Sequence, residues 1–292
     1  MILRRISSLQ RQISLVRRTC KKIMARKILL LFLILALDIA SYGQEPQAAK
    51  IALGSKTAKD GFRNETEIAG KFNNWRTDED AKIWLATMNY KIAEIENVAA
   101  TKPHGEKADV QVKITIKKRD FTEGISTKLV SSANGFNQRD KRWLATYAKI
   151  WKMPADVVAA LKFFLGETKP GKPSRNADRM FLNELSSEAR AAVVDFFTAN
   201  KSNILSDLFK GDGRQSAAWM MVALKSQEKP RWVLRNIEDT IRFFGTGNVS
   251  ITRSGNLKIG RITMQRKGGD GGRETAKMLQ FKINPVLLFD SK

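Results

Sequence analysis

The stretch KADVQVKITIKKRDFTEGISTKLV, residues 107–130, decides the expected fold of this chain. From Asp109 to Ile116 polar and apolar residues alternate, so the apolar ones share one face of an extended strand. A polar turn is predicted around Lys117–Glu123, and a second strand over Gly124–Val130. The stretch therefore predicts a β-hairpin with one face in the core.

The hairpin also carries a pattern suited to phosphodiester chemistry. Ser126 and Lys128 point to the same side of the second strand and Asp109 opens the first, so the hairpin can bring Asp109 close to Lys128. A carboxylate can hold Mg²⁺, which lowers the pKa of a bound water, and a nearby lysine can orient that water or stabilise the transition state. Asp and Lys at such places are also common in purely structural roles, and that interpretation stays open.

Helical and strand patterns follow the hairpin in both directions. Residues 63–75 have helical periodicity, and Thr77-Asp78-Glu79-Asp80 is typical of a helix capping box. Further helices are predicted over Gln138–Trp151, Pro154–Leu165, 186–199, 201–209 and 236–244, and strands near 217–224, 231–235, 248–252 and 257–264, the last with a bulge at Gly260. The mixture predicts an α/β or α+β fold with a central mixed β-sheet flanked by helices.

The charge of the chain indicates a polyanionic partner. Its 292 residues include 52 Lys and Arg against 29 Asp and Glu, a net charge of +23. The first 27 residues are rich in Lys and Arg and contain no acid, but the basic excess persists in the rest of the chain. Nucleic acid is the simplest partner for such a chain, and a merely basic protein is the alternative.

Single cysteine and histidine residues exclude several kinds of site. Cys20 alone can form neither a disulfide framework nor a cysteine-based zinc site. His104 alone cannot supply the two histidines that His–metal nucleases and paired His-Lys phosphodiesterase motifs need. Chemistry based on carboxylates and lysine is the easiest to build here.

Residues 1–50 are expected to lie outside the folded domain, which we place at residues 51–292. They contain the apolar run ILLLFLILAL, Ile28–Leu37, which is too short to cross a bilayer comfortably. The run resembles a secretory signal if translation begins at Met24, and a buried helix is a further alternative. We expect a cytoplasmic protein with no stable membrane partner, and export or membrane anchoring is the alternative.

Two basic segments are predicted to contact DNA. In residues 258–282, glycines let the backbone approach a phosphate, and polar side chains can bind phosphates or base edges. Those side chains are Gln265, Arg266, Lys267, Arg273, Gln280 and Lys282. Residues 134–142 follow the second strand of the hairpin and add Asn137, Gln138, Lys141 and Arg142. The alternatives are a flexible solvated loop for the first segment and a solvated helix start for the second.

Several stretches resemble bacterial type II restriction endonucleases of the PD-(D/E)XK kind. They are GSKTAKDGFRNETEI, KADVQVKI, ISTKLVSSANGFNQRDKRW, LKIGRITMQRKGGDGGRETAKMLQFKINP and the closing LLF, in patches from Ile51 to Phe289. The resemblance implies Mg²⁺-dependent cleavage of a short site in double-stranded DNA, with Asp109 as metal ligand and Lys128 as catalytic residue. Ser126 stands where an acid is usual, and Ala108 stands in place of the proline.

The missing acid implies that a second carboxylate comes from another element. Glu65 and Glu67 on the first helix are the expected metal ligands beside Asp109. The resemblance further implies restriction–modification defence, with a cognate methyltransferase acting on the same site, and a homodimer is possible within it. Two alternatives stay open: a DNA-binding protein that has lost cleavage, which Ser126 would allow, and an exported or membrane-anchored basic nuclease.

Overall fold

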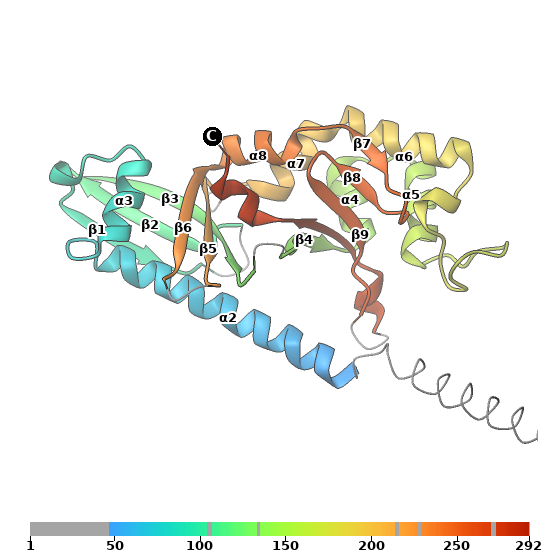
Figure 1. The fold of residues 1–292 in the computed structure, drawn as a ribbon. Helices are drawn as coiled ribbons and strands as arrows, with labels where there is room; N and C mark the ends of the chain where they lie inside the picture. Colours follow the sequence, from blue (N-terminus) through green and yellow to red (C-terminus); the bar gives the residue numbers. More distant parts are fainter. Residues whose placement is uncertain are drawn as a thin grey trace, which may run out of the picture. The chain divides into compact units, whose positions relative to one another are not determined.

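The computed structural model describes residues 47–103, 107–132, 135–213, 216–226, 229–269 and 273–291. Residues 53–292 cluster as one unit, and Figure 1 labels its elements. The signal-like run, Cys20 and His104 lie outside the described residues, so the extension of residues 1–50 stays a prediction. Within the described ranges, no helix combines the length and apolar character that a membrane span requires.

The predicted hairpin forms as strands β2, Val110–Ile116, and β3, Arg119–Val130, which pair antiparallel. Its turn consists of Lys117 and Lys118, whose φ angles are positive at 48° and 59°, as the tight two-residue turns of hairpins require. The second strand therefore begins before the predicted Gly124. The first four residues of β3 are exposed on both faces, so no apolar alternation marks them in the sequence.

Strands β2 and β3 belong to a mixed five-stranded sheet, here called sheet A. Its order is β1-β2-β3-β5-β6; β3 and β5 are parallel and the other pairs antiparallel. The remaining strands are β1, Asn97–Thr101, β5, Trp219–Leu224, and β6, Arg231–Asn236. Every residue of β5 is buried, because its two faces contribute to two different hydrophobic clusters. The predicted mixed sheet is confirmed.

Helix α3, Glu79–Thr87, and the C-terminal turns of helix α2, Gln47–Asn73, cover one face of sheet A (Figure 1). Phe72 of α2 and Trp84 of α3 are buried in the cluster on that face, with ring centroids 5.2 Å apart. The N-cap of α3 is Asp78, whose carboxylate accepts the Ala81 backbone N–H at 3.0 Å. The helix start that the capping sequence predicts is therefore confirmed.

A second sheet, here called sheet B, has five antiparallel strands in the order β4-β10-β9-β8-β7. Its strands are β4, Asn137–Arg142, β7, Val249–Ile251, β8, Leu257–Ile259, β9, Ile262–Arg266, and β10, Leu279–Ile283. Strand β10 was not among the predicted strands. The helix predicted over Gln138–Trp151 is wrong in its first part: Gln138 to Arg142 form a strand because they pair with β10, and helix α4 spans only Leu144–Trp151.

The predicted bulge at Gly260 is also wrong. Gly260 has a φ of 57°, and Ile259 pairs with Ile262, so Gly260 and Arg261 form a two-residue turn between β8 and β9. The change in apolar phase at Gly260 therefore marks a reversal of the chain, not an extra residue within one strand.

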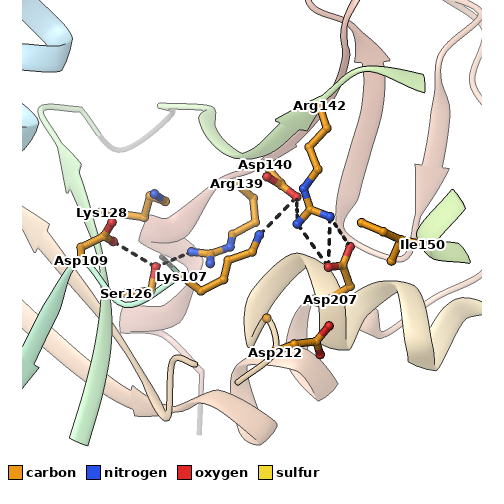
Figure 2. A pocket seen from close by; sticks show the side chains of 11 residues that line it. Lys107, Asp109, Ser126, Lys128, Arg139, Asp140, Arg142, Ile150, Asp207 and Asp212 are labelled. Atoms are coloured by element: carbon orange, nitrogen blue, oxygen red, sulfur yellow. Dashed lines mark hydrogen bonds and ion pairs between the residues drawn. The ribbon is translucent and has the colours of Figure 1, made fainter. Parts of the chain in front are cut away.

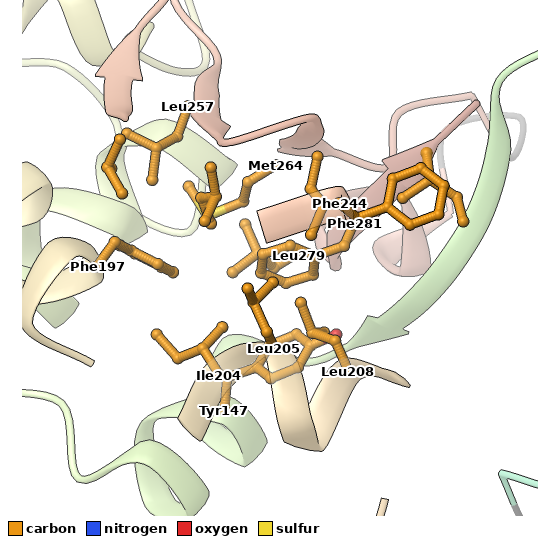
Figure 3. Packing of buried hydrophobic residues seen from close by; sticks show 14 of the residues in the cluster. Tyr147, Phe197, Ile204, Leu205, Leu208, Phe244, Leu257, Met264, Leu279 and Phe281 are labelled. Atoms are coloured by element: carbon orange, nitrogen blue, oxygen red, sulfur yellow. The ribbon is translucent and has the colours of Figure 1, made fainter. Parts of the chain in front are cut away.

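The larger hydrophobic cluster joins sheet B to five helices. These are α4, α5, Ala155–Leu165, α6, Ser187–Ala199, α7, Lys201–Phe209, and α8, Ile237–Gly245. Figure 3 shows Tyr147 of α4 together with Leu205 and Leu208 of α7 in this cluster, and the Tyr147 ring lies edge-on to Phe281 of β10 at 5.3 Å. Short 3-10 turns occur at Ile92–Glu94, Leu182–Glu184, Glu274–Lys277 and Pro285–Phe289. The helices predicted over 186–199 and 201–209 are confirmed.

Candidate active site

A charged pocket of about 440 Å³ lies where the β2–β3 hairpin meets strand β4 and the end of helix α7 (Figure 2). Four basic and four acidic side chains line it, together with Ser126. The charged ones are Lys107, Lys128, Arg139, Arg142, Asp109, Asp140, Asp207 and Asp212. So many charged groups in one cavity suit an ionic substrate or a metal ion rather than an apolar ligand.

The structure brings Asp109, Ser126 and Lys128 together, as the hairpin predicts. Asp109 immediately precedes β2, and its backbone N–H donates to the Ile125 carbonyl of β3 at 2.9 Å. Its carboxylate Oδ2 accepts the Thr127 backbone N–H at 2.6 Å and the Ser126 hydroxyl at 3.2 Å. Asp109 is therefore held directly against the strand that carries Lys128.

Lys128 is a desolvated cation beside two acids. Burial lowers the pKa of the Lys128 ammonium; the charge of Asp109 raises it in part, Arg139 lowers it further, and Glu65 raises it. Within the described residues, no hydrogen bond or ion pair engages its Nζ. An amine with a lowered pKa can exchange a proton nearer neutral pH, so Lys128 can serve as a proton carrier or as a charge for a developing anion.

The structure distinguishes the two helix acids. Burial and the like charge of Asp109 raise the pKa of the Glu65 carboxyl, which is 17% exposed and lies 3.4 Å from Lys102 Nζ. Glu67 forms an ion pair with Lys225 instead. Of the two predicted ligands, Glu65 is therefore the one whose pKa is raised by the charge of Asp109.

The oxygen atoms of Asp109 and Glu65 are donors that fit Mg²⁺. Burial and, after it, repulsion by Asp109 raise the pKa of Glu65, and a divalent cation between the two carboxylates would relieve that repulsion. In the described ranges no three or more His, Cys, Asp or Glu side chains are grouped so that together they could hold a metal ion. Mg²⁺ commonly binds one or two carboxylates and completes its shell with water and substrate phosphate, so two acids fit such a site.

Arg139, which is 6% exposed, is a pocket residue that was not among the predicted site residues. Its Nη1 donates to Ser126 Oγ at 2.6 Å, so it reaches the pocket from strand β4. A bulge in β4 accounts for this direction: Asp140 pairs with Phe281 and Gln138 with Lys282, which leaves Arg139 without a cross-strand partner. The sequence shows Arg139 only as one cation in a basic run, because a bulge in β4 depends on a strand far away in the chain.

A network of ion pairs lies next to Arg139. Asp140 contacts Lys107 at 3.2 Å and Arg142 at 2.9 Å, and Arg142 also contacts Asp207 at 2.9 Å. The Trp151 indole donates to Asp207 at 3.0 Å, and burial lowers the pKa of Lys107 to about 8. Arg142 thus has its partners inside the protein, and this geometry does not support its predicted DNA contact.

Several predicted DNA-binding residues share one face of sheet B. Gln280 on β10 lies opposite Gln265 of β9 and Lys141 of β4, and Lys282 lies opposite Gln138. Gln280 donates to Gln138 at 2.8 Å, and Gln265 donates to Gln280 at 3.4 Å. A row of amides with two lysines therefore crosses three strands, on the face opposite the apolar residues of β10, and Gln280 at its centre is 6% exposed.

The other predicted DNA-binding residues lie apart from that row. Asn137 begins β4 opposite Ile283, and Arg273 is exposed just before a 3-10 turn. Arg266 ends β9, and its Nε donates to the Leu165 carbonyl at 2.8 Å. Lys267 follows it, and its backbone N–H donates to Met278 at 2.9 Å. The glycines 271 and 272 lie outside the described residues.

Comparison with known proteins adds two matches. The family described as R.HinP1I restriction endonuclease matches residues 88–289. The crystal structure of restriction endonuclease MspI in complex with its cognate DNA matches with a TM-score of 0.51 and 11% sequence identity, over 72% of this chain and 79% of that chain. No curated protein matches the sequence. The match to MspI shows a shared fold, which agrees with the predicted α/β class.

Proposed function

Because this chain belongs to the R.HinP1I restriction endonuclease family, we propose that it hydrolyses phosphodiester bonds at a specific site in double-stranded DNA, with Mg²⁺ as cofactor. The family supports site-specific cleavage of DNA. The main support for the proposed active site is the placement of Asp109 against the strand of Lys128. The charge of Asp109 also helps to raise the pKa of Glu65, the second proposed ligand.

In this proposal the chain's own residues have separate tasks. Asp109 and Glu65 hold the cation, and the Thr127 backbone N–H fixes Asp109 Oδ2 at 2.6 Å. Bound Mg²⁺ would lower the pKa of a water molecule and neutralise charge on the scissile phosphate. Lys128 would orient or deprotonate the attacking water and would stabilise the negative charge that develops on the phosphate. Glu67, which pairs with Lys225, has no catalytic task.

The amide row on sheet B supports the proposed DNA contact. Gln138 and Gln265 present amide groups, which can read base edges, and Lys141 and Lys282 can bind phosphates. Gln280 is 6% exposed and lies between the two glutamines, bonded to both, so its task is to hold them in place. The first two strands of the row, β4 and β10, pair directly, and β4 also carries Arg139 into the pocket. DNA bound along this face would therefore lie on the strand that also contributes to the candidate active site.

A restriction–modification role follows from the proposed activity. Unmodified DNA would be cut, and a cognate methyltransferase would protect the host at the same site without needing to bind this chain. Such a role places the protein in the cytoplasm. A homodimer would let two such sites act on the two strands of one duplex.

DNA binding without cleavage is the second candidate function. Its support is Ser126, whose hydroxyl is bonded to Asp109 and Arg139 where the general PD-(D/E)XK pattern has an acid. This candidate predicts Asp109-independent DNA binding and no cutting under any metal condition.

Digestion of a sequenced plasmid tests the proposal. The full chain is incubated with Mg²⁺, Ca²⁺ or EDTA, and discrete fragments are expected with Mg²⁺ alone. Asp109→Asn should abolish cleavage, because an amide keeps the shape but not the charge of the metal ligand, and DNA binding in Ca²⁺ should persist. Asp120→Asn is the matched control, since Asp120 is on the same hairpin but pairs with Lys113.

If the Asp109→Asn variant cut DNA at the rate of the unaltered chain, the proposed active site would be refuted. Binding without cutting by the unaltered chain would favour the second candidate. Fragments that appear with EDTA would refute the metal requirement.

A further inference from the structure

Arg139 uses every nitrogen of its guanidinium inside the protein. Nε donates to the Leu208 carbonyl at 2.8 Å and Nη2 to the Phe209 carbonyl at 3.0 Å, while Nη1 donates to Ser126 Oγ at 2.6 Å. Leu208 and Phe209 end helix α7, where the last carbonyls lack helical donors and carry the negative end of the helix dipole. Arg139 therefore ties the active-site strand β3 to the end of α7.

The bond to Arg139 gives the Ser126 hydroxyl a direction. Arginine can only donate hydrogen bonds, so Ser126 Oγ accepts from Nη1 and its single hydrogen is available for Asp109 Oδ2 at 3.2 Å. The Thr127 N–H donates to the same Oδ2. Two donors on Oδ2 hold the carboxylate in one orientation, and among the described residues Oδ1 has no partner.

The position of Arg139 also decides what an acid at position 126 would do. A carboxylate there would replace a hydroxyl that lies 2.6 Å from Nη1, next to a guanidinium that is 6% exposed. Charge-assisted pairing between arginine and a carboxylate is strong in such a desolvated place. The carboxylate would therefore be neutralised by Arg139 and would be a poor ligand for a metal ion.

We propose that Arg139 is a positioning residue for cleavage, which orients Asp109 through Ser126 and makes position 126 unavailable as a metal ligand. The inference rests on the proposed function. It gives the serine at position 126 a defined role as a link between a fixed cation and the metal-binding acid. A serine without this link would be free to rotate and would leave Asp109 held by the Thr127 N–H alone.

A double-mutant cycle on cleavage rate tests the link. Ser126→Ala and Arg139→Met should each slow cleavage at saturating DNA and Mg²⁺ by about 10–100-fold, because each removes the same oriented bond to Asp109. The double variant should be no slower than the slower single variant. If Ser126 and Arg139 act through one shared link to Asp109, their fold-decreases in cleavage rate are not independent. Fold-decreases that multiply in the double variant would therefore overturn the proposal.

Arg142→Met is the matched control for this cycle. Arg142 lies on the same strand and is also tied to helix α7, through Asp207, but it has no bond to Ser126. The fold-decrease in cleavage rate caused by Arg142→Met should multiply with that caused by Ser126→Ala. The main effect of Arg142→Met should be a lower Tm. If Arg139→Met does not fold, Arg139→Lys replaces it, because one amine cannot reproduce the planar three-way contact; the same absence of multiplication with Ser126→Ala is expected.

Calorimetric titration with Ca²⁺, on the full chain without DNA, provides a readout that needs no cleavage. Ser126→Asp should change Ca²⁺ affinity by less than about threefold while Arg139 is present. With Arg139→Met, the same substitution should tighten Ca²⁺ binding by about tenfold or more, because the added carboxylate is then free to bind the cation. An arginine with a purely structural role would not affect how much Ser126→Asp increases Ca²⁺ affinity. An equal increase with and without Arg139 would therefore overturn the proposal.

The proposal and the proposed function can fail separately. Wild-type cleavage by Asp109→Asn refutes the active site itself. Loss of cleavage in Asp109→Asn, together with effects of Ser126→Ala and Arg139→Met that multiply, refutes only the positioning role.

Discussion

Replacing Lys128 with methionine is expected to stabilise the protein while it abolishes cleavage. The ordinary pKa of a lysine is 10.5, and burial lowers that of Lys128 by more than Asp109 and Glu65 raise it. The charged form is therefore less favourable in the folded protein than in the unfolded chain. Among the described residues its Nζ has no hydrogen-bond or ion-pair partner that would offset the loss of water.

The sign and size of the effect follow from these surroundings. A lysine whose pKa is lowered on folding costs stability at neutral pH, and the cost fades as the pH rises toward 10.5. Methionine has a similar length and no charge, so it removes the cost of desolvating the half-buried ammonium; replacing a whole buried ion pair by apolar groups is neutral or gains up to about 4 kcal/mol, and a single half-buried charge should gain less. Asp109 and Glu65 lose a cation that attracts them, which removes part of the gain. We expect a net gain of about 1 kcal/mol at pH 7 and a smaller one near pH 10.

The cleavage rate should fall although the stability rises. Without the lysine, the cation that remains near Asp109 is Arg139, whose nitrogens are all engaged inside the protein. It cannot replace the lysine at the water or the charged transition state, and a loss of about 10³-fold is expected, which is about 4 kcal/mol of barrier. Stability is measured by urea unfolding of the full chain without divalent ions, at pH 7 and near pH 10. Cleavage is measured as single-turnover digestion of a plasmid with Mg²⁺.

The matched control is Lys225→Met. Lys225 pairs with Glu67 and its Nζ lies 5.1 Å from the Trp232 ring centroid, so the change should cost a little stability and leave cleavage unchanged. The reasoning about Lys128 would be refuted if Lys128→Met lowered the free energy of unfolding by more than about 1 kcal/mol at pH 7. It would also be refuted if that variant cut within about tenfold of the unaltered rate.

Three further outcomes are expected. Glu65→Gln should reduce the cleavage rate about 100-fold or more, whereas Glu67→Gln should stay within about threefold of the unaltered rate, because the charge of Asp109 acts on Glu65. Parallel plasmid digests compare the two variants, and equal losses would contradict this assignment. Alanine at both Arg266 and Lys267 should weaken DNA binding and lower the log–log salt slope by up to about two units, as titrations at several salt concentrations would show; an unchanged slope and affinity would place both charges away from DNA. Deleting residues 1–45 should leave a soluble chain that binds DNA, measured by sedimentation and gel shift, and an insoluble product would contradict the predicted domain boundary.

The hairpin and its reactive pair could be predicted from the sequence because they depend on neighbours in the chain. Alternation from Asp109 to Ile116 sets which residues share a face, and a short turn limits how two adjacent strands can pair. Asp109 and Lys128 could therefore approach one another once both strands formed, and the turn at Lys117 and Lys118, shorter than predicted, set the register that brings them together. Helix periodicity in 186–199 and 201–209 is equally local, and those two helices have the predicted bounds within a residue.

Strand β4 and the choice between Glu65 and Glu67 needed the tertiary structure. Residues Gln138 to Arg142 have no apolar alternation, and they become a strand only because β10, far away in the chain, supplies hydrogen-bond partners. Glu65 and Glu67 lie two residues apart on one helix, and their packing against different partners, Lys102 and Lys225, separates them.

Arg139 shows the physical reason most directly. The sequence determined that a carboxylate, a serine and a lysine would share one side of a hairpin, because strand geometry repeats every two residues. The environment of that serine was decided by a bulge opposite β10 and by the free carbonyls at the end of α7. Hydrogen bonds and burial act through space, so partners distant in the chain set the direction of Ser126 and, through it, that of Asp109.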